Sequence, residues 1–144
     1  MEPLFPYANY IIGTLVFVIG FLLHGIAQGI YIVNPDLAKR IGLAEPGLLP
    51  EYEIYERGIA VADLILSPIY LLATIGLFYD LSFGYKLLWF PGVIFIYHGC
   101  SFWFWTKNRR QAGYPLYTDS LRIGWTLTNL IAGILAILIA WNRF

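Results

Sequence analysis

Apolar residues gather in four long runs along this chain, and short stretches that carry most of the charge separate them. Each run is long enough, at about 1.5 Å per residue, to cross a hydrocarbon core about 30 Å thick as an α-helix. The short connections favour consecutive helices that pack side by side in opposite directions. The pattern therefore predicts an all-α membrane protein. It is expected to be one polytopic domain over residues 1–144, an antiparallel four-transmembrane-helix bundle with helices at about 8–33, 58–79, 85–105 and 121–141.

Prolines and flanking charges refine the expected helix ends. Pro50 followed by Glu51 and Glu53 is typical of a helix start, because proline is tolerated at the first position and the helix dipole favours acids there. The second helix is therefore expected to begin about two turns before its apolar core. Pro91 is expected to kink the third helix near its start. The first run is too long for a signal-peptide core and follows no Lys or Arg, so it is expected to remain as a helix.

The composition agrees with a membrane protein. Hydrophobic residues make up 59% of the chain and charged residues only 12%, a balance that soluble domains rarely have. Nine basic and nine acidic residues give no net charge, which argues against nucleic-acid binding. Cys100 is the only cysteine, so an internal disulfide and a thiolate metal cluster are excluded.

The distribution of lysine and arginine predicts the orientation. The loops between helices one and two and between helices three and four, taken to the helix ends, hold Lys39, Arg40, Arg57, Lys107, Arg109, Arg110 and Arg122. The opposite side holds only Lys86 and Arg143. By the positive-inside rule, loops 34–57 and 106–120 are expected in the cytoplasm. The membrane would be a prokaryotic inner membrane or a eukaryotic endomembrane.

Asp63 is the unusual residue of the second apolar run. Other polar residues share its side of the helix: Glu56, Ser67, Tyr70 and Thr74. A carboxylate that faces lipid is costly, so an intramembrane acid usually faces the bundle interior. Pro68 has no N–H and leaves the Leu64 carbonyl without its helical donor, one turn away. Two interpretations stay open: Asp63 makes an interhelical hydrogen bond, or it faces a ligand.

Polar residues of all four helices fall at one depth in the membrane. With antiparallel helices, four of them lie at a common level on the side of the basic loops: His24, Asp63, His98 and Asn129. Gln28, Ser101 and Thr126 follow slightly beyond this level. Depth alone does not determine which way each side chain points around its helix. The coincidence of level predicts a polar pocket inside the membrane.

Four functions compete for such a pocket. In a site for a lipophilic molecule, Asp63 would be the acid or counter-ion and a histidine would tune it, the pairing that proton-transfer chemistry also needs. Two histidines at similar depth would suit bis-imidazole ligation of haem b in an electron-transfer bundle. His24, His98 and Asp63 match a 2-His-1-carboxylate metal set in composition only, so no metal site is predicted. In a structural or accessory subunit the polar groups would only pair with one another.

We favour the lipophilic-ligand site, with Asp63 and His24 as the catalytic candidates if the protein is an enzyme. Its reaction would then be an isomerisation by proton transfer. No cofactor is expected. The expected partners are membrane lipids and a lipophilic small molecule, not nucleic acid, and a homodimer stays open. The candidate ligand-binding residues are Gln28, Tyr31, Ser67, Tyr97, His98, Ser101, Thr126 and Asn129.

Short motifs in all four helices are similar to those of one membrane-protein family. They are His24 with Gln28 and Gly29, Asp63 ahead of Pro68, the pair Ile96-Tyr97, and Pro115-Leu116-Tyr117 followed by Asn129. In this order the chain resembles the EXPERA superfamily of four-helix membrane proteins, which includes sterol isomerases of the emopamil-binding type. The resemblance implies a sterol- or amine-like ligand in a lateral pocket. Where those isomerases carry Glu, this chain has Gln28, which cannot ionise, so binding without turnover is favoured.

Overall fold

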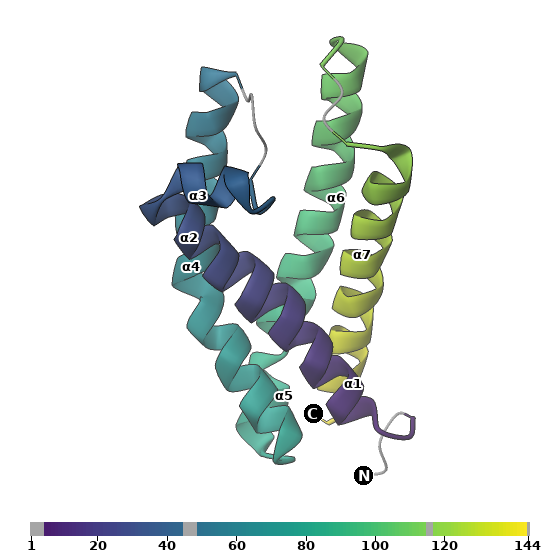
Figure 1. Ribbon diagram of the computed structural model, residues 1–144. Helices are drawn as coiled ribbons and strands as arrows, with labels where there is room; N and C mark the ends of the chain where they lie inside the picture. The colour runs from purple at the N-terminus through teal and green to yellow at the C-terminus, as the bar shows by residue number, and fades with distance from the viewer. Residues whose placement is uncertain (1–4, 45–48, 115–116, 144) are drawn as a thin grey trace.

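The computed structural model describes residues 5–44, 49–114 and 117–143 (Figure 1). Pro115 and Leu116, which belong to one of the family-like motifs, lie outside these ranges. Within the described ranges every element of regular secondary structure is a helix, which confirms the all-α prediction for this part of the chain. In chain order the elements are α1 (Ala8–Leu15), η1 (Val16–Ala27), α2 (Gln28–Val33), α3 (Pro35–Arg40), α4 (Pro50–Phe78), α5 (Ser82–Leu87), α6 (Trp89–Gln111) and α7 (Asp119–Asn142).

Among the described residues, four helical spans are long and apolar enough to cross a membrane, in agreement with the predicted number of such helices. They are Ala8–Val33 (α1, η1 and α2), Pro50–Phe78 (α4), Ser82–Gln111 (α5 and α6) and Asp119–Asn142 (α7). Helix α4 begins at Pro50, as predicted. The third span extends beyond the predicted 85–105 at both ends, because Lys, Arg and Gln continue a helix well after the apolar run has ended.

The first span is not a uniform α-helix. Its middle part, η1, is a π-helical segment of 12 residues. In a π-helix each N–H bonds to the carbonyl five residues earlier, which widens the turn and changes the side-chain spacing around the axis. Such segments are rare and occur frequently at functional sites. His24, the site candidate of this span, lies inside η1.

The third span is interrupted at Leu88, between α5 and α6. Pro91 accounts for the interruption, because it has no N–H to donate to the carbonyl of Leu87. The next residue, Gly92, resumes the ladder by donating its N–H to the Leu88 carbonyl at 3.0 Å. The predicted kink near the start of the third helix corresponds to this interruption.

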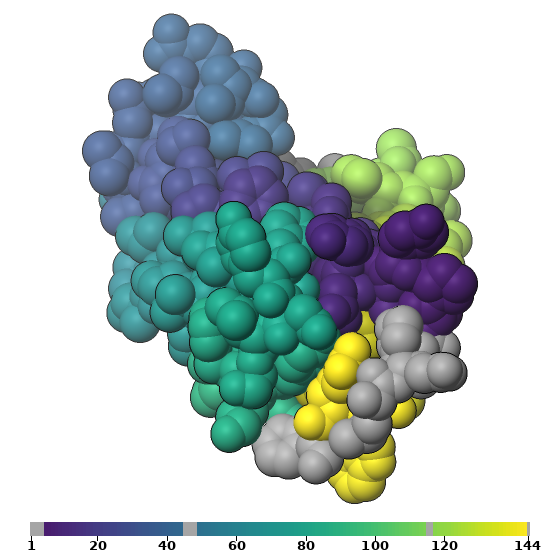
Figure 2. Space-filling view, turned by 90° about the horizontal axis from the view of Figure 1, so that it is seen from below, coloured from purple at the N-terminus to yellow at the C-terminus, as the bar shows by residue number. Residues whose placement is uncertain are grey.

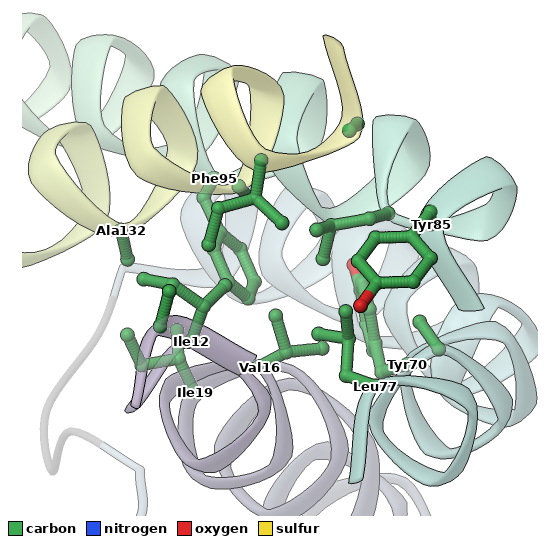
Figure 3. Close-up of a cluster of buried hydrophobic side chains, with 14 residues drawn as sticks. Ile12, Val16, Ile19, Tyr70, Leu77, Tyr85, Phe95 and Ala132 are labelled. Carbon is green, nitrogen blue, oxygen red and sulfur yellow. The ribbon is translucent and has the colours of Figure 1, made fainter. Parts of the chain in front are cut away.

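The apolar core lies where the four spans meet (Figure 3). It contains residues of every span, including Ile12, Val16, Ile19, Tyr70, Ala73, Leu77, Tyr85, Leu88, Phe95, Ala132, Ala136 and Ile139. In a bilayer the lipid tails are as apolar as these side chains, so burial by itself stabilises little. In that surrounding, close packing and the exclusion of lipid from the interface would hold the spans together.

The connection between α4 and α5 is tight because Gly76 and Gly84 pack backbone against backbone. A Cβ on Gly76 would lie 2.3 Å from the Cα of Gly84. Helix α4 ends in a Schellman motif, in which Leu81 donates to the Gly76 carbonyl at 2.7 Å and Asp80 donates to the Leu77 carbonyl at 3.1 Å. Asp80 takes the left-handed position of that motif, with φ 53°, where glycine is the usual residue.

A polar cluster lies at the end of the bundle that holds both termini, the end seen in Figure 2. The Asp80 carboxylate accepts hydrogen bonds from the Tyr85 hydroxyl and from the Asn9 amide, the latter at 3.1 Å. Arg143 Nη2 lies 3.6 Å from the same carboxylate oxygen. The cluster joins the starts of α1 and α5 to the residue that follows α7.

We expect the cluster to give the fold a small acid-sensitive contribution. The Tyr85 hydroxyl lowers the pKa of Asp80 below its usual 3.8, helped by Arg143 and Asn9 and opposed by desolvation. A carboxyl group whose pKa is lower in the folded than in the unfolded state contributes stability at pH values above its unfolded pKa. This contribution is lost as the pH falls through the lowered pKa of the folded state. Thermal unfolding in detergent should therefore show a Tm difference between wild type and Asp80→Asn that shrinks below pH 3.8. The difference will be small, because the side chain is 63% exposed. A difference that does not change with pH would contradict this assignment.

Candidate functional site

A cavity of about 380 Å³ lies among the four spans, on the side toward which α4 and α6 diverge in Figure 1. Its wall combines residues of η1, α2, α4, α6 and α7 with residues that follow α3. The polar and charged wall residues are His24, Gln28, Glu56, Asp63, His98 and Ser101. The aromatic wall residues are Tyr31, Tyr55, Phe102, Trp105, Tyr117 and Trp125. A cavity of this size, mostly apolar with a few polar groups, has the build of a small-molecule site.

Asp63 and His98 form a polar contact across the cavity wall. His98 Nε2 lies 3.0 Å from Asp63 Oδ1 and joins α6 to α4. The Asp63 residue is only 3% exposed, so its carboxylate depends on this partner and on whatever the cavity contains. The two interpretations of Asp63, interhelical partner and cavity-facing acid, are thus both compatible with its position.

His24 lies beside this pair. Its ring centroid is 4.4 Å from that of His98, and the rings of Tyr70, Phe95 and Trp125 surround it. The residue is 4% exposed, and its Nδ1 is buried without a hydrogen-bond partner among the described residues. A buried polar atom left unpaired costs about 1–3 kcal/mol. The His24 imidazole, which borders the cavity, therefore keeps one ring nitrogen without a hydrogen bond among the described residues.

The contact between the two imidazoles bears on the haem alternative. Bis-imidazole ligation places the iron, and the porphyrin around it, between two histidine rings. The rings of His24 and His98 touch each other, so a macrocycle does not fit between them in this arrangement. The haem alternative stays a prediction.

Six of the predicted site residues line the cavity together: His24, Gln28, Tyr31, Asp63, His98 and Ser101. They come from the first span, from α4 and from α6. Residues that the sequence predicted at similar depth on three spans therefore line one cavity. The fourth helix contributes Trp125 and Leu121 to the wall instead of its predicted polar residues.

Four predicted ligand-binding residues lie outside the cavity wall. Ser67 donates its hydroxyl to the Leu64 carbonyl at 2.8 Å and so fills the acceptor that Pro68 leaves free. Tyr97 is 59% exposed and faces away from the bundle. Tyr97 has the wrong rotation around α6, whereas Ser67 shares the side of Asp63 but lies one turn further along α4, packed against Gly25. Ser67 therefore supplies the hydrogen bond that the Leu64 carbonyl of α4 would otherwise lack.

The two predicted site residues of α7 also lie outside the main cavity. Asn129 is fully buried and donates its amide to the Trp125 carbonyl at 2.9 Å. Thr126 lines a second, apolar cavity of about 310 Å³ together with residues of α6 such as Trp103 and Leu130 of its own helix. Asn129 therefore bonds within its own helix, and neither residue lines the main cavity.

Sequence reasoning missed the aromatic part of the wall. Phe102 and Trp105 belong to a run of four aromatic residues, a pattern typical of a membrane-interface belt. Because they are three residues apart, they share one face of α6 and line the cavity, whereas Phe104 is 59% exposed. Glu56 was also left out, although it lies two turns before Asp63 on the same side of α4. Helical spacing was the signal that could have found all three.

A buried arginine lies next to this wall. The Arg109 guanidinium carbon is 4.5 Å from the ring centre of Tyr52 and 5.3 Å from that of Trp105. Arg109 is only 3% exposed, because these rings cover it from solvent. The sequence predicted that this residue lies in a loop. The helix α6 continues to Gln111, which carries Arg109 into the bundle.

Comparison with known proteins found no matching family model, no matching curated protein and no matching solved structure. The resemblance to the EXPERA superfamily therefore stays a prediction.

Proposed function

We propose that this chain is an integral membrane protein that binds a lipophilic small molecule in the cavity beside Asp63. In this proposal its four spans cross the bilayer antiparallel to one another, and the segments 34–57 and 106–120, predicted as loops, lie on the cytoplasmic side. The observation that carries the proposal is the wall itself. One buried carboxylate and two imidazoles lie together in a mostly apolar, aromatic cavity that four spans enclose. Polar groups so placed are expensive inside a membrane and usually serve a ligand or a partner.

The chemistry of the cavity wall favours a ligand that has an elongated apolar body and one polar end. The polar end would lie at Asp63, where an ammonium group would pair with the carboxylate or a hydroxyl group would donate to it. The apolar body would lie against aromatic residues such as Phe102, Trp105 and Trp125, whose faces also attract a cation. Sterol- and amine-like molecules have this build, in agreement with what the EXPERA resemblance implies.

Proton transfer is the second part of the proposal. A carboxylate beside an imidazole is the composition of a general acid–base pair, and the pair here faces a cavity. Gln28 lines the same cavity but cannot ionise, so any isomerisation would have to use Asp63, His98 and His24. Binding is therefore the primary function proposed, and isomerisation of the bound molecule is secondary to it.

A structural or accessory subunit is the alternative that one observation favours. The contact of Asp63 with His98 joins α4 to α6, as a purely structural hydrogen bond would. A subunit of this kind needs the pair for stability and does not need the cavity. The two functions therefore differ in whether any ligand changes the stability of the purified protein.

We expect cationic lipophilic amines and sterols to raise the Tm of the purified protein in detergent containing a chelator. A ligand at about 100 times its Kd stabilises the folded state by about 2.7 kcal/mol through mass action. In Asp63→Asn the amine effect should be lost, because the amide keeps the size of the side chain but removes its charge. The sterol effect should weaken less, because a hydroxyl group still has an acceptor there.

Asp36→Asn is the matched control for this experiment. It removes the same charge from an exposed residue of α3 that does not line the cavity, and it should keep the full response. If amines stabilise Asp63→Asn as well as wild type, the site does not lie at Asp63. If no ligand stabilises wild type while Asp63→Asn melts much lower, the accessory-subunit alternative is correct.

A further inference from the structure

The nitrogen and oxygen ligand atoms of His24, Asp63 and His98 converge at one end of the cavity. One such atom from each residue lies within 4.8 Å of the other two. The three residues come from η1, α4 and α6, so tertiary packing alone brings them together. We propose that this triad binds a divalent transition-metal ion such as Zn²⁺ or Fe²⁺.

The distances suit an ion of this kind. Zinc lies about 2.0–2.2 Å from imidazole nitrogen and carboxylate oxygen, so two ligand atoms on one tetrahedral ion are roughly 3.3 Å apart. The 3.0 Å between His98 Nε2 and Asp63 Oδ1 is close to this value. The widest separation within the triad, at most 4.8 Å, exceeds this value by roughly 1.5 Å, so binding requires the three side chains to close on the ion.

The unpaired nitrogen of His24 is a second, independent observation. Nδ1 is buried and has no hydrogen-bond partner among the described residues. A hydrogen bond between Asp63 and His98 explains those two residues as packing, but it does not explain a second buried imidazole against them. A metal ion uses all three side chains, because imidazole nitrogen and carboxylate oxygen are its ordinary ligands.

The ligand atoms of the triad also limit which metal ions can bind. Two imidazoles and one carboxylate, with no thiolate at the triad, suit Zn²⁺, Fe²⁺ or Co²⁺ rather than Cu⁺. Three protein ligands leave at least one coordination position open, as in catalytic rather than structural sites. All three residues line the cavity, so the open position would face a molecule bound there.

This arrangement changes which molecule the metal-loaded protein would bind. A bound ion uses the charge of Asp63, so the carboxylate no longer attracts an ammonium group. A lipophilic molecule with an oxygen donor, such as a hydroxyl or a ketone, would coordinate the open position instead. Metal binding itself does not depend on the proposed lipophilic ligand, so the two proposals can fail separately.

Titration with Co²⁺ tests the proposal. The full chain is purified without a polyhistidine tag, freed of metal with a chelator, and titrated with Co²⁺ in the absence of any lipophilic ligand. We expect one Co²⁺ per chain, with visible absorption bands typical of four or five ligands, and displacement of Co²⁺ by Zn²⁺. His24→Gln, Asp63→Asn and His98→Gln should each weaken binding tenfold or more. Asp36→Asn should bind as wild type does, because that residue lies outside the cavity.

If a variant does not fold, X-ray absorption spectroscopy of the wild-type protein loaded with Co²⁺ still tests the proposal. We expect nitrogen and oxygen ligands that include two imidazoles. Fewer than two imidazoles in that spectrum, binding that survives the loss of either histidine, or no stoichiometric binding by wild type would overturn the proposal. A wild-type protein that binds no Co²⁺ but responds to amines would leave the lipophilic-ligand proposal standing.

Discussion

Replacing His98 with leucine is expected to lower the free energy of unfolding by about 3–5 kcal/mol, the cost of removing one partner of a buried polar pair. Asp63 is 3% exposed and has its polar contact with His98 at 3.0 Å, so the leucine would leave a buried carboxylate without that partner. The measurement is unfolding by heat or by a denaturing detergent, with a chelator present so that no metal contributes.

The double variant His98→Leu/Asp63→Leu separates this mechanism from loss of packing. With both polar groups gone, nothing charged is left unpaired, and apolar replacements of buried ion pairs are often neutral or stabilising. Most of the lost stability should therefore return. A loss below about 1 kcal/mol in the single variant would instead mean that water in the cavity solvates Asp63.

Replacing Gly76 with alanine is expected to destabilise the protein by about 1–3 kcal/mol or more, although alanine favours a helix more than glycine does. The added Cβ would lie 2.3 Å from the Cα and 2.7 Å from the N of Gly84. Both of these atoms belong to the backbone of α5, so no rotamer change can relieve the contact. The start of α5 would have to move away from the end of α4.

Gly58 provides the matched control in the same helix. Nothing lies within 4 Å of a Cβ built at Gly58, so Gly58→Ala should be neutral or should stabilise α4 by up to about 1 kcal/mol. Thermal unfolding of both variants in the same detergent makes the comparison. Equal Tm values for the two variants would mean that the turn between α4 and α5 adapts without cost.

The helices could be predicted because their signals are local. Apolar length marked the four spans, and Pro50 with two acids in the first turn marked the start of α4. The same signals did not reveal the π-helical segment η1, whose apolar residues also suit an α-helix. The sequence signals also ended the third helix at 105, whereas α6 continues to Gln111. Hydropathy marks where an apolar run ends, and a helix can continue beyond it.

The site could be predicted only in part, and the reason is rotation around the helix axis. Depth along each span follows from counting residues, and it brought His24, Asp63 and His98 to one level. The direction of each side chain depends on which neighbour the helix packs against. That packing turned Tyr97 and Thr126 away from the main cavity and brought Phe102 and Trp105 into its wall.

The sequence by itself determined the all-helical class of the described chain and its four apolar spans, because length, hydropathy and proline act on each helix separately. Tertiary structure alone decided which polar residues share a cavity. It placed His98 3.0 Å from Asp63 and His24 against His98, three contacting side chains from three spans. Such contacts depend on how whole helices cross and on where glycines let them approach, and no local pattern in the sequence encodes that.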